Sequence, residues 1–238
     1  LAAFQDAATA PLVSGFPRKV TGTPGEALVI PLMQFILLGF LPLGWMRRSL
    51  KPGFGAGCGQ LFLARRESYL QVGGHGAIRA SRHDGLRLPR AFRRQGLRTD
   101  LCDGTDLATV RMYRSWGELR EGLAKNATEG MAAPRAILFW TATLLLGQVV
   151  VPLQALALLL VPVPAGRAAL VLGGTALVLL PRLAGVVRFR QPLAGALLHP
   201  LGILLFLSIQ WSALAAQLLG RPATWRGRSY APQNPEGE

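Results

Sequence analysis

Three long apolar stretches in the second half of the chain constrain its fold more than any other feature. They cover Ala136–Val161, Ala168–Val187 and Leu193–Leu219. A helix needs about 20 mainly apolar residues to cross a bilayer, and each stretch reaches that length. Backbone polar groups in the bilayer must be hydrogen-bonded within the protein, which favours helices. We therefore expect an all-α transmembrane region of about three spans over residues 135–220.

A fourth apolar stretch, Ala27–Met46, is open to two interpretations. It is nearly as long as the others, but Pro31 and Pro42 interrupt it, and Arg47 and Arg48 follow directly. Proline removes a backbone donor and disturbs a helix interior. The stretch is either a helix that is buried in a domain or lies in the membrane interface, or a true span.

The remaining composition divides the chain into three parts. Hydrophobic residues make up 50% of the sequence and charged residues 16%, but the apolar residues concentrate after Ala136. We expect an α/β domain over residues 1–134, the membrane region over 135–220 and a polar tail over 221–238. The polar part holds only two cysteines, Cys58 and Cys102, at no zinc-binding spacing. Such sparse cysteine predicts no disulfide framework and favours a reducing, cytoplasmic setting.

The charge is strongly positive and unevenly placed. The formal net charge is +14, and nine Lys and Arg residues lie between Arg65 and Arg98. A basic surface beside a membrane favours anionic lipid headgroups or phosphate-bearing substrates as partners. No recognition motif accompanies the charge, so we do not expect nucleic acid as a partner.

The polar part shows alternating helix and strand patterns with glycine-rich turns. We expect strands at Pro11–Ser14 and Gln60–Leu63, helical turns at Arg65–Val72 and a helix from Asp84 to a stop at Gly96. After that helix we expect a turn-rich return over Leu97–Thr105, a strand or short helix over Leu107–Tyr113 and an amphipathic helix over Trp116–Lys125.

Asp84 is the first candidate for catalysis. Glycosyl transfer with inversion needs a carboxylate that accepts the proton of the acceptor hydroxyl. An aspartate at a helix start, among arginines that favour its ionised form, suits this role. The same residue type is also an ordinary N-cap, and the sequence alone leaves both roles open.

Two further groups of residues are candidates for ligand binding. Gly73, Gly74 and His75 form a turn where backbone can approach a ligand and an imidazole can donate, or else a plain turn with an exposed histidine. Arg111, Tyr113 and Trp116 combine positive charge with aromatic faces, which suits a diphosphate and a stacked ring or, alternatively, anchoring at a membrane surface. Gly59 and Gln60, in the segment Gly57–Gln60, either wrap a small ligand or form a simple turn.

The order of these pieces resembles the C-terminal half of a membrane-bound family 2 glycosyltransferase, of the branch that includes hopene-associated and carotenoid glycosyltransferases. The matching pieces are Leu12–Arg18, Cys58–Gln60, Arg66–Tyr69, Gly73–His75, Asp84 with Leu86, Arg111–Tyr113, Gly122 with Lys125 and Asn126, and Trp225–Tyr230.

This resemblance implies a nucleotide-sugar-binding domain of the GT-A type on the cytoplasmic face of the inner (plasma) membrane. It implies a nucleotide-sugar donor, a divalent metal (Mg or Mn) and Asp84 as general base of an inverting displacement. The three apolar stretches next to the site favour a lipid-type acceptor. Gly74 and His75 would line the donor or acceptor pocket. Arg111 and Tyr113 would stand where related enzymes carry a Gln-x-x-Arg-Trp motif at the donor diphosphate.

The sequence departs from the family pattern in two ways. Where relatives often carry an acidic pair, this chain has His83 and Asp84. It also contains no Asp-x-Asp metal motif, which in the family lies upstream of the point that corresponds to Leu1. We therefore expect the metal ligands to lie outside this chain, in a preceding segment.

Two questions stay open at this stage. A cytoplasmic polar segment puts Arg182, Arg188 and Arg190 inside, as the positive-inside rule requires, but three spans would place the basic tail outside. Either the tail is an exception or one apolar stretch is miscounted. The alternative function is a non-catalytic membrane subunit that docks anionic lipid or a protein partner through its basic segment.

Overall fold

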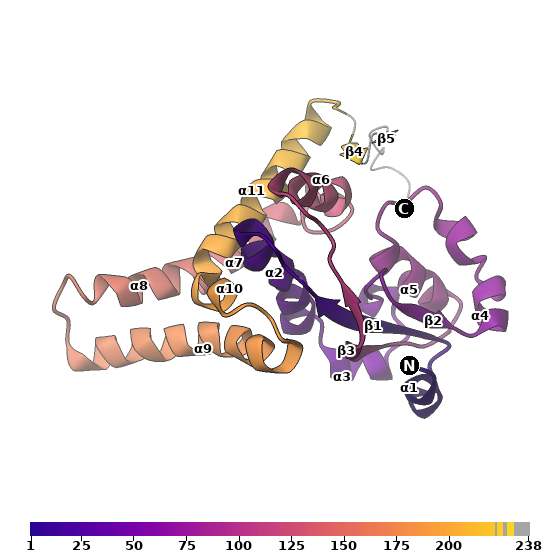
Figure 1. The fold of residues 1–238 in the computed structure, drawn as a ribbon, viewed down its shortest axis with the longest axis horizontal. Helices are drawn as coiled ribbons and strands as arrows, with labels where there is room; N and C mark the ends of the chain where they lie inside the picture. Colours follow the sequence, from indigo (N-terminus) through magenta and orange to yellow (C-terminus); the bar gives the residue numbers. More distant parts are fainter. Residues whose placement is uncertain (222, 226–227, 231–238) are drawn as a thin grey trace. The chain divides into compact units, whose positions relative to one another are not determined.

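The computed structural model describes residues 1–221, together with the backbone of Ala223–Trp225 and Arg228–Tyr230. The chain forms two compact units, which we describe separately. The first contains Leu1–Val20 and Met33–Arg111, and the second contains Thr21–Leu32 and the chain from Met112 onward. Helix α2 (Pro24–Phe40) begins in the second unit and ends in the first (Figure 1).

A mixed three-stranded sheet forms the centre of the first unit. β1 (Leu12–Lys19) lies between β2 (Phe62–Ala64), which is antiparallel to it, and β3 (Thr99–Val110), which is parallel to it. Leu12 stands opposite both Ala64 and Thr99. The register with β3 shifts after Pro17, because proline offers no backbone donor to the ladder. The central strand is buried from Leu12 to Pro17, as expected for a strand covered on both faces.

Short helices surround this sheet. They are α1 (Ala2–Ala8), α3 (Leu43–Arg48), α4 (Arg66–Gln71) and α5 (Asp84–Arg94), with 3₁₀ turns at Pro52–Phe54 and Gly74–Ile78. α5 buries Leu88 and Phe92 against Leu12 of β1 and Val72. α3 buries Met46 in a second cluster with Phe16, Cys58 and Leu101. The sheet and α5 therefore share one core, which holds α5 against the sheet.

The second unit is helical. It contains α6 (Trp116–Ala127), α7 (Ile137–Leu145), a π-helical turn (Leu146–Val150), α8 (Val151–Ala157), α9 (Ala165–Phe189), α10 (Leu193–Leu197) and α11 (His199–Leu218), followed by the paired strands β4 (Ala223–Trp225) and β5 (Arg228–Tyr230).

Three helical segments of the described residues are long and apolar enough to cross a membrane. They are Ile137–Ala157, Ala165–Phe189 and His199–Leu218. The three apolar stretches predicted from the sequence are therefore confirmed as helical, although the first contains a π-helical turn and the third is divided into α10 and α11. Together with the small mixed sheet, they confirm an α/β part followed by an all-α apolar part.

The apolar stretch Ala27–Met46 is two helices rather than one. α2 has 17 residues, continues through Pro31 and ends at Phe40. α3 begins at Leu43, directly after Pro42. Val29 and Leu32 are fully buried. A Cβ atom on Gly202 of α11 would lie 2.7 Å from the Leu28 carbonyl, so the first half of α2 packs closely within the second unit. These contacts favour the buried-helix interpretation over a true span.

Other predictions of local structure had mixed outcomes. The helical turns after Arg65, the helix from Asp84 and the helix from Trp116 are confirmed. The predicted turn-rich return over Leu97–Thr105 is wrong, because β3 occupies most of it and extends to Val110. The strand predicted at Pro11–Ser14 is longer than expected and reaches Lys19.

Candidate functional site

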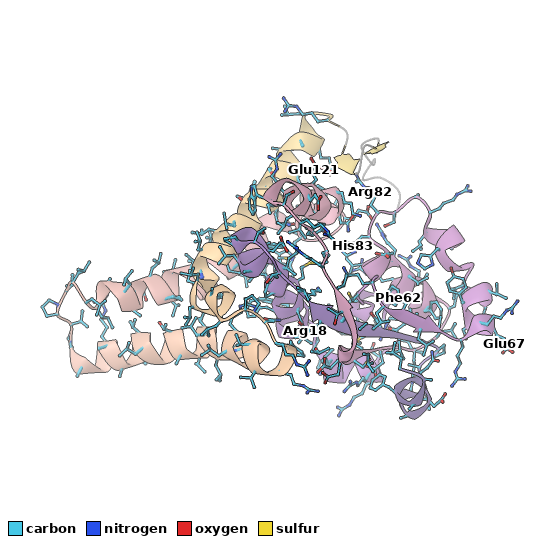
Figure 2. All side chains as sticks on the ribbon, in the orientation of Figure 1. Arg18, Phe62, Glu67, Arg82, His83 and Glu121 are labelled. Atoms are coloured by element: carbon cyan, nitrogen blue, oxygen red, sulfur yellow. The ribbon has the colours of Figure 1, made fainter. Side chains whose placement is uncertain are left out.

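Asp84 lies at the first residue of α5, directly after Arg82 and His83, which are labelled in Figure 2. Its Oδ1 atom accepts a hydrogen bond of 2.8 Å from the backbone N–H of Gly85. The side chain is half-buried. The N-terminal end of a helix carries free N–H groups and a partial positive charge, so a carboxylate is favoured there. The predicted position of Asp84 at a helix start is confirmed.

A glycine-rich loop closes over this carboxylate. A Cβ atom added to Gly59 would overlap the carboxylate of Asp84. A Cβ atom on Gly85 would lie 2.6 Å from the carbonyl oxygen of Gly57. The loop and the start of α5 can therefore approach each other only because both positions are glycine. Gly59 and Asp84, two predicted site residues, are brought together by the fold.

Ser14 of β1 holds this loop in place. Its Oγ accepts the backbone N–H of Cys58 at 2.7 Å and lies 3.1 Å from the carbonyl oxygen of the same residue. Phe62, labelled in Figure 2, covers the loop, since a Cβ atom on Gly57 would lie 2.7 Å from its ring. The sequence analysis did not single out Ser14 or Gly85. A hydroxyl within an otherwise apolar strand was the available indication for Ser14, whereas nothing local indicated Gly85.

Gln60 is exposed at the end of the loop. Its Oε1 accepts a weak hydrogen bond from the Cys58 thiol at 3.4 Å. This contact uses only the oxygen of the Gln60 amide.

The Gly73–His75 turn forms a separate cluster with Tyr69. Gly73 and Gly74 have φ values of 76° and 51°, and a Cβ atom on Gly74 would overlap the Tyr69 ring. The Tyr69 hydroxyl accepts the His75 backbone N–H at 3.0 Å and lies 2.8 Å from His75 Nδ1. Which of these two atoms donates depends on the imidazole tautomer. His75 is exposed, and this contact with Tyr69 holds its ring.

The third predicted group is divided between the two units. Arg111 is the exposed last residue of the first unit. Tyr113 and Trp116 belong to the second unit, where Tyr113 is buried against Gly122 and Trp116 is the partly exposed first residue of α6. Burial raises the pKa of Tyr113 to about 12. The phenol of Tyr113 is therefore neutral at physiological pH and serves packing within its unit.

Arginines surround the start and middle of α5. Burial lowers the pKa of Arg90, and repulsion from Arg87 and Arg94 lowers it further. Arg90 nevertheless stays protonated at neutral pH because its guanidinium is such a strong base. The helix that begins with Asp84 is therefore strongly cationic along its length, which suits a phosphate-bearing ligand or an anionic surface.

The described residues do not provide a metal site. Within residues 1–221, no group of three or more His, Cys, Asp and Glu side chains is arranged to hold an ion. The divalent metal that the family resemblance implies therefore does not fit the donors of this part of the chain. We assign no step of a reaction to it.

A hollow of about 370 Å³ lies in the first unit, away from these candidates. It is lined by residues of α1 with Arg47, Arg98 and Asp100. The Arg47 Nε atom lies 3.1 Å from Asp100 Oδ1, so the charges that face the hollow are partly neutralised. The hollow contains none of the predicted site residues.

Comparison of the chain with protein-family models, with curated protein sequences and with solved structures finds no match.

Proposed function

We propose that the chain is the acceptor-side part of a membrane glycosyltransferase that acts with inversion on a lipid-type acceptor. In this proposal Asp84 is the general base. The observation that carries it is the position of the Asp84 carboxylate, at the start of a cationic helix and beside a loop that needs glycine at position 59 to approach it. The apolar helices of the same chain would keep this site next to a source of lipid hydroxyl groups.

The proposed reaction has a simple balance. Asp84 accepts the proton of the acceptor hydroxyl, and the acceptor oxygen forms a bond to the anomeric carbon of the donor sugar. The bond from that carbon to the donor diphosphate breaks, and the nucleoside diphosphate leaves with both electrons. The proton then passes from Asp84 to water. The arginines of α5 would stabilise the diphosphate charge, and the imidazole of His75 would donate to a sugar or phosphate oxygen.

The experiment is Asp84→Asn in the complete product of the gene, in native membranes. Labelled UDP-glucose, UDP-galactose and GDP-mannose are supplied separately, and label is measured in the chloroform-extractable lipid. The amide keeps an acceptor for the Gly85 N–H but cannot take a proton. We expect incorporation to fall by about 10²- to 10⁴-fold, with donor binding and thermal stability unchanged.

Asp6→Asn is the matched control. Asp6 is an exposed carboxylate of the same unit, paired with Arg65 at 2.7 Å, and takes no part in the proposed site. Its replacement should leave incorporation unchanged. Equal incorporation by the wild type and Asp84→Asn, or label only in water-soluble products, would contradict the proposal.

A non-catalytic docking subunit is the second candidate, and the arginine cluster of α5 favours it. Such a subunit would bind anionic membranes but transfer no sugar in the wild type. Arg87→Gln with Arg94→Gln would then weaken membrane or partner binding, while Asp84→Asn would have no effect. The two candidates therefore predict opposite outcomes for the aspartate and arginine variants.

A further inference from the structure

The end of α2 and the helix α3 carry an unusual set of exposed apolar side chains. Trp45 is 68% exposed, Leu50 43%, Leu38 38% and Phe40 36%. All four lie between residues 38 and 50 of the first unit. A folded surface seldom groups large apolar side chains in this way unless something covers them. We name these four residues, together with Arg48 and Lys51, the α3 surface.

The exposure of Trp45 is imposed by a firmly held helix. Its neighbour Met46 is only 1% exposed and packs in the core with Phe16 and Leu101. The Met46 carbonyl accepts a hydrogen bond of 3.0 Å from the buried guanidinium of Arg93. Neighbouring residues of a helix point about 100° apart, so burying Met46 directs Trp45 away from the core. The tryptophan is thus fixed in an outward position.

The charge around these apolar side chains is of one sign. Arg48 and Lys51 are exposed, and no Asp or Glu occurs between Glu26 and Glu67. Arg47 is neutralised by Asp100, whereas within residues 1–221 neither Arg48 nor Lys51 forms a salt bridge. A surface with this pattern complements a partner that offers an apolar region to the exposed apolar side chains and negative charge to Arg48 and Lys51.

We propose that the α3 surface rests on the anionic headgroup layer of the bilayer, with Trp45 at the boundary between headgroups and acyl chains. Tryptophan is enriched at that level because its ring is apolar and its N–H is polar. Arginine and lysine beside it are attracted by anionic lipid. The bilayer is the favoured occupant because the same chain carries three helices long and apolar enough to enter one. In this proposal the α3 surface, named after the helix labelled α3 in Figure 1, is an interfacial contact of the polar unit.

The test places a polarity-sensitive fluorophore (NBD) at Trp45→Cys in the full chain, with Cys58→Ala and Cys102→Ala. The protein is reconstituted in nanodiscs of phosphatidylcholine with 30% phosphatidylglycerol. We expect a blue-shifted emission, quenching by lipid with a nitroxide near the headgroup, and about threefold protection from acrylamide relative to detergent. Adding Arg48→Gln and Lys51→Gln, or omitting phosphatidylglycerol, should reduce the lipid quenching at least by half.

Leu70→Cys is the matched control. Leu70 is 65% exposed on α4 of the same unit, and no other large apolar side chain between residues 51 and 106 is exposed. It should remain accessible to acrylamide and be unaffected by nitroxide lipid. Equal behaviour at positions 45 and 70 would overturn the proposal. Protection of position 45 from acrylamide without lipid quenching would also overturn it, and would assign the α3 surface to a protein partner. These readouts require no sugar transfer, so they are independent of the proposed function.

Discussion

At the scale of single residues, the burial of Tyr113 predicts a loss of stability at alkaline pH. Its phenol is 6% exposed, and burial raises its pKa from 10.0 to about 12. The unfolded chain loses this proton near pH 10, before the folded chain does. Stability is therefore unaffected below pH 10 and falls as the pH rises toward 12, by about 2–3 kcal/mol at the upper end.

Tyr113→Phe should remove this alkaline loss, because phenylalanine has no proton to release. The measurement is the thermal unfolding midpoint of the full chain in detergent between pH 9 and 12. Tyr69→Phe leaves Tyr113 in place and should retain the alkaline loss. An unchanged alkaline slope in Tyr113→Phe, combined with a large loss of donor binding, would mean that the phenol faces a ligand rather than the protein interior.

Single residues also show what could be predicted from the sequence about the site. The sequence predicts Asp84 at a helix start because Leu88 and Phe92 follow it at helical spacing and Gly96 ends the pattern. The structure agrees, since Leu88 and Phe92 are buried and Gly96 has a φ of 72°. The contact between Gly59 and Asp84 could not be predicted. It depends on a loop returning to the helix start after being fixed by Ser14, and no local pattern encodes that distance.

At the scale of elements, Arg93 connects α5 with α3 and β3. It is 3% exposed and donates to Thr99 Oγ1 at 2.8 Å, and to the carbonyl oxygens of Met46 and Thr99, each at 3.0 Å. Arg93→Lys keeps the charge but cannot reach these acceptors with one ammonium group. We expect a loss of about 2–4 kcal/mol in unfolding free energy, measured by urea denaturation of the full chain in detergent.

Arg94→Lys provides the comparison at the next position. Arg94 is exposed, so its replacement should change stability by less than about 0.5 kcal/mol. If both variants lost stability equally, the three elements would not depend on the buried guanidinium. A loss confined to Arg93→Lys would identify Arg93 as the connection that keeps α3 in place.

Elements differ in how far their own sequences determine them. α6 was predictable because Ser115 caps its first turn, accepting the Glu118 N–H at 3.2 Å, and its apolar residues repeat at helical spacing. β3 was not, because its Asp and Gly residues have low strand propensity. Its parallel pairing with β1, a partner distant in the sequence, supplies the hydrogen bonds that make it a strand.

At the scale of the whole molecule, contacts within the second unit bear on the number of membrane crossings. α8 and α9 pack side by side as a hairpin, whereas β4 lies beside α6 and the end of α11 (Figure 1). Within each of these segments we compare an apolar stretch of 18 residues. Only 17% of it is buried in Ile137–Ala157 and in Ala165–Phe189, against 44% in His199–Leu218. The first two helices thus leave most of their surfaces free for lipid, while α11 is buried to a much greater extent by protein.

These contacts predict that the chain crosses the membrane twice between α6 and β4, and that α11 does not cross. An even number of crossings returns β4 to the side on which the polar helix α6 lies. It also places Arg188, Arg190 and Arg221 on one side, which satisfies the positive-inside rule that three crossings would break. The apolar length of α11 would then serve packing within the unit rather than a passage through lipid.

Labelling with a membrane-impermeant maleimide distinguishes two crossings from three. Single cysteines are introduced as Glu129→Cys after α6, as Pro162→Cys between α8 and α9, and beyond Glu238, in sealed vesicles of the full chain without its native cysteines. Two crossings place position 129 and the C-terminus on the same side, and position 162 on the other. Labelling of the C-terminus together with position 162 would show that α11 crosses as well, and the contact between β4 and α6 would then have to be rejected.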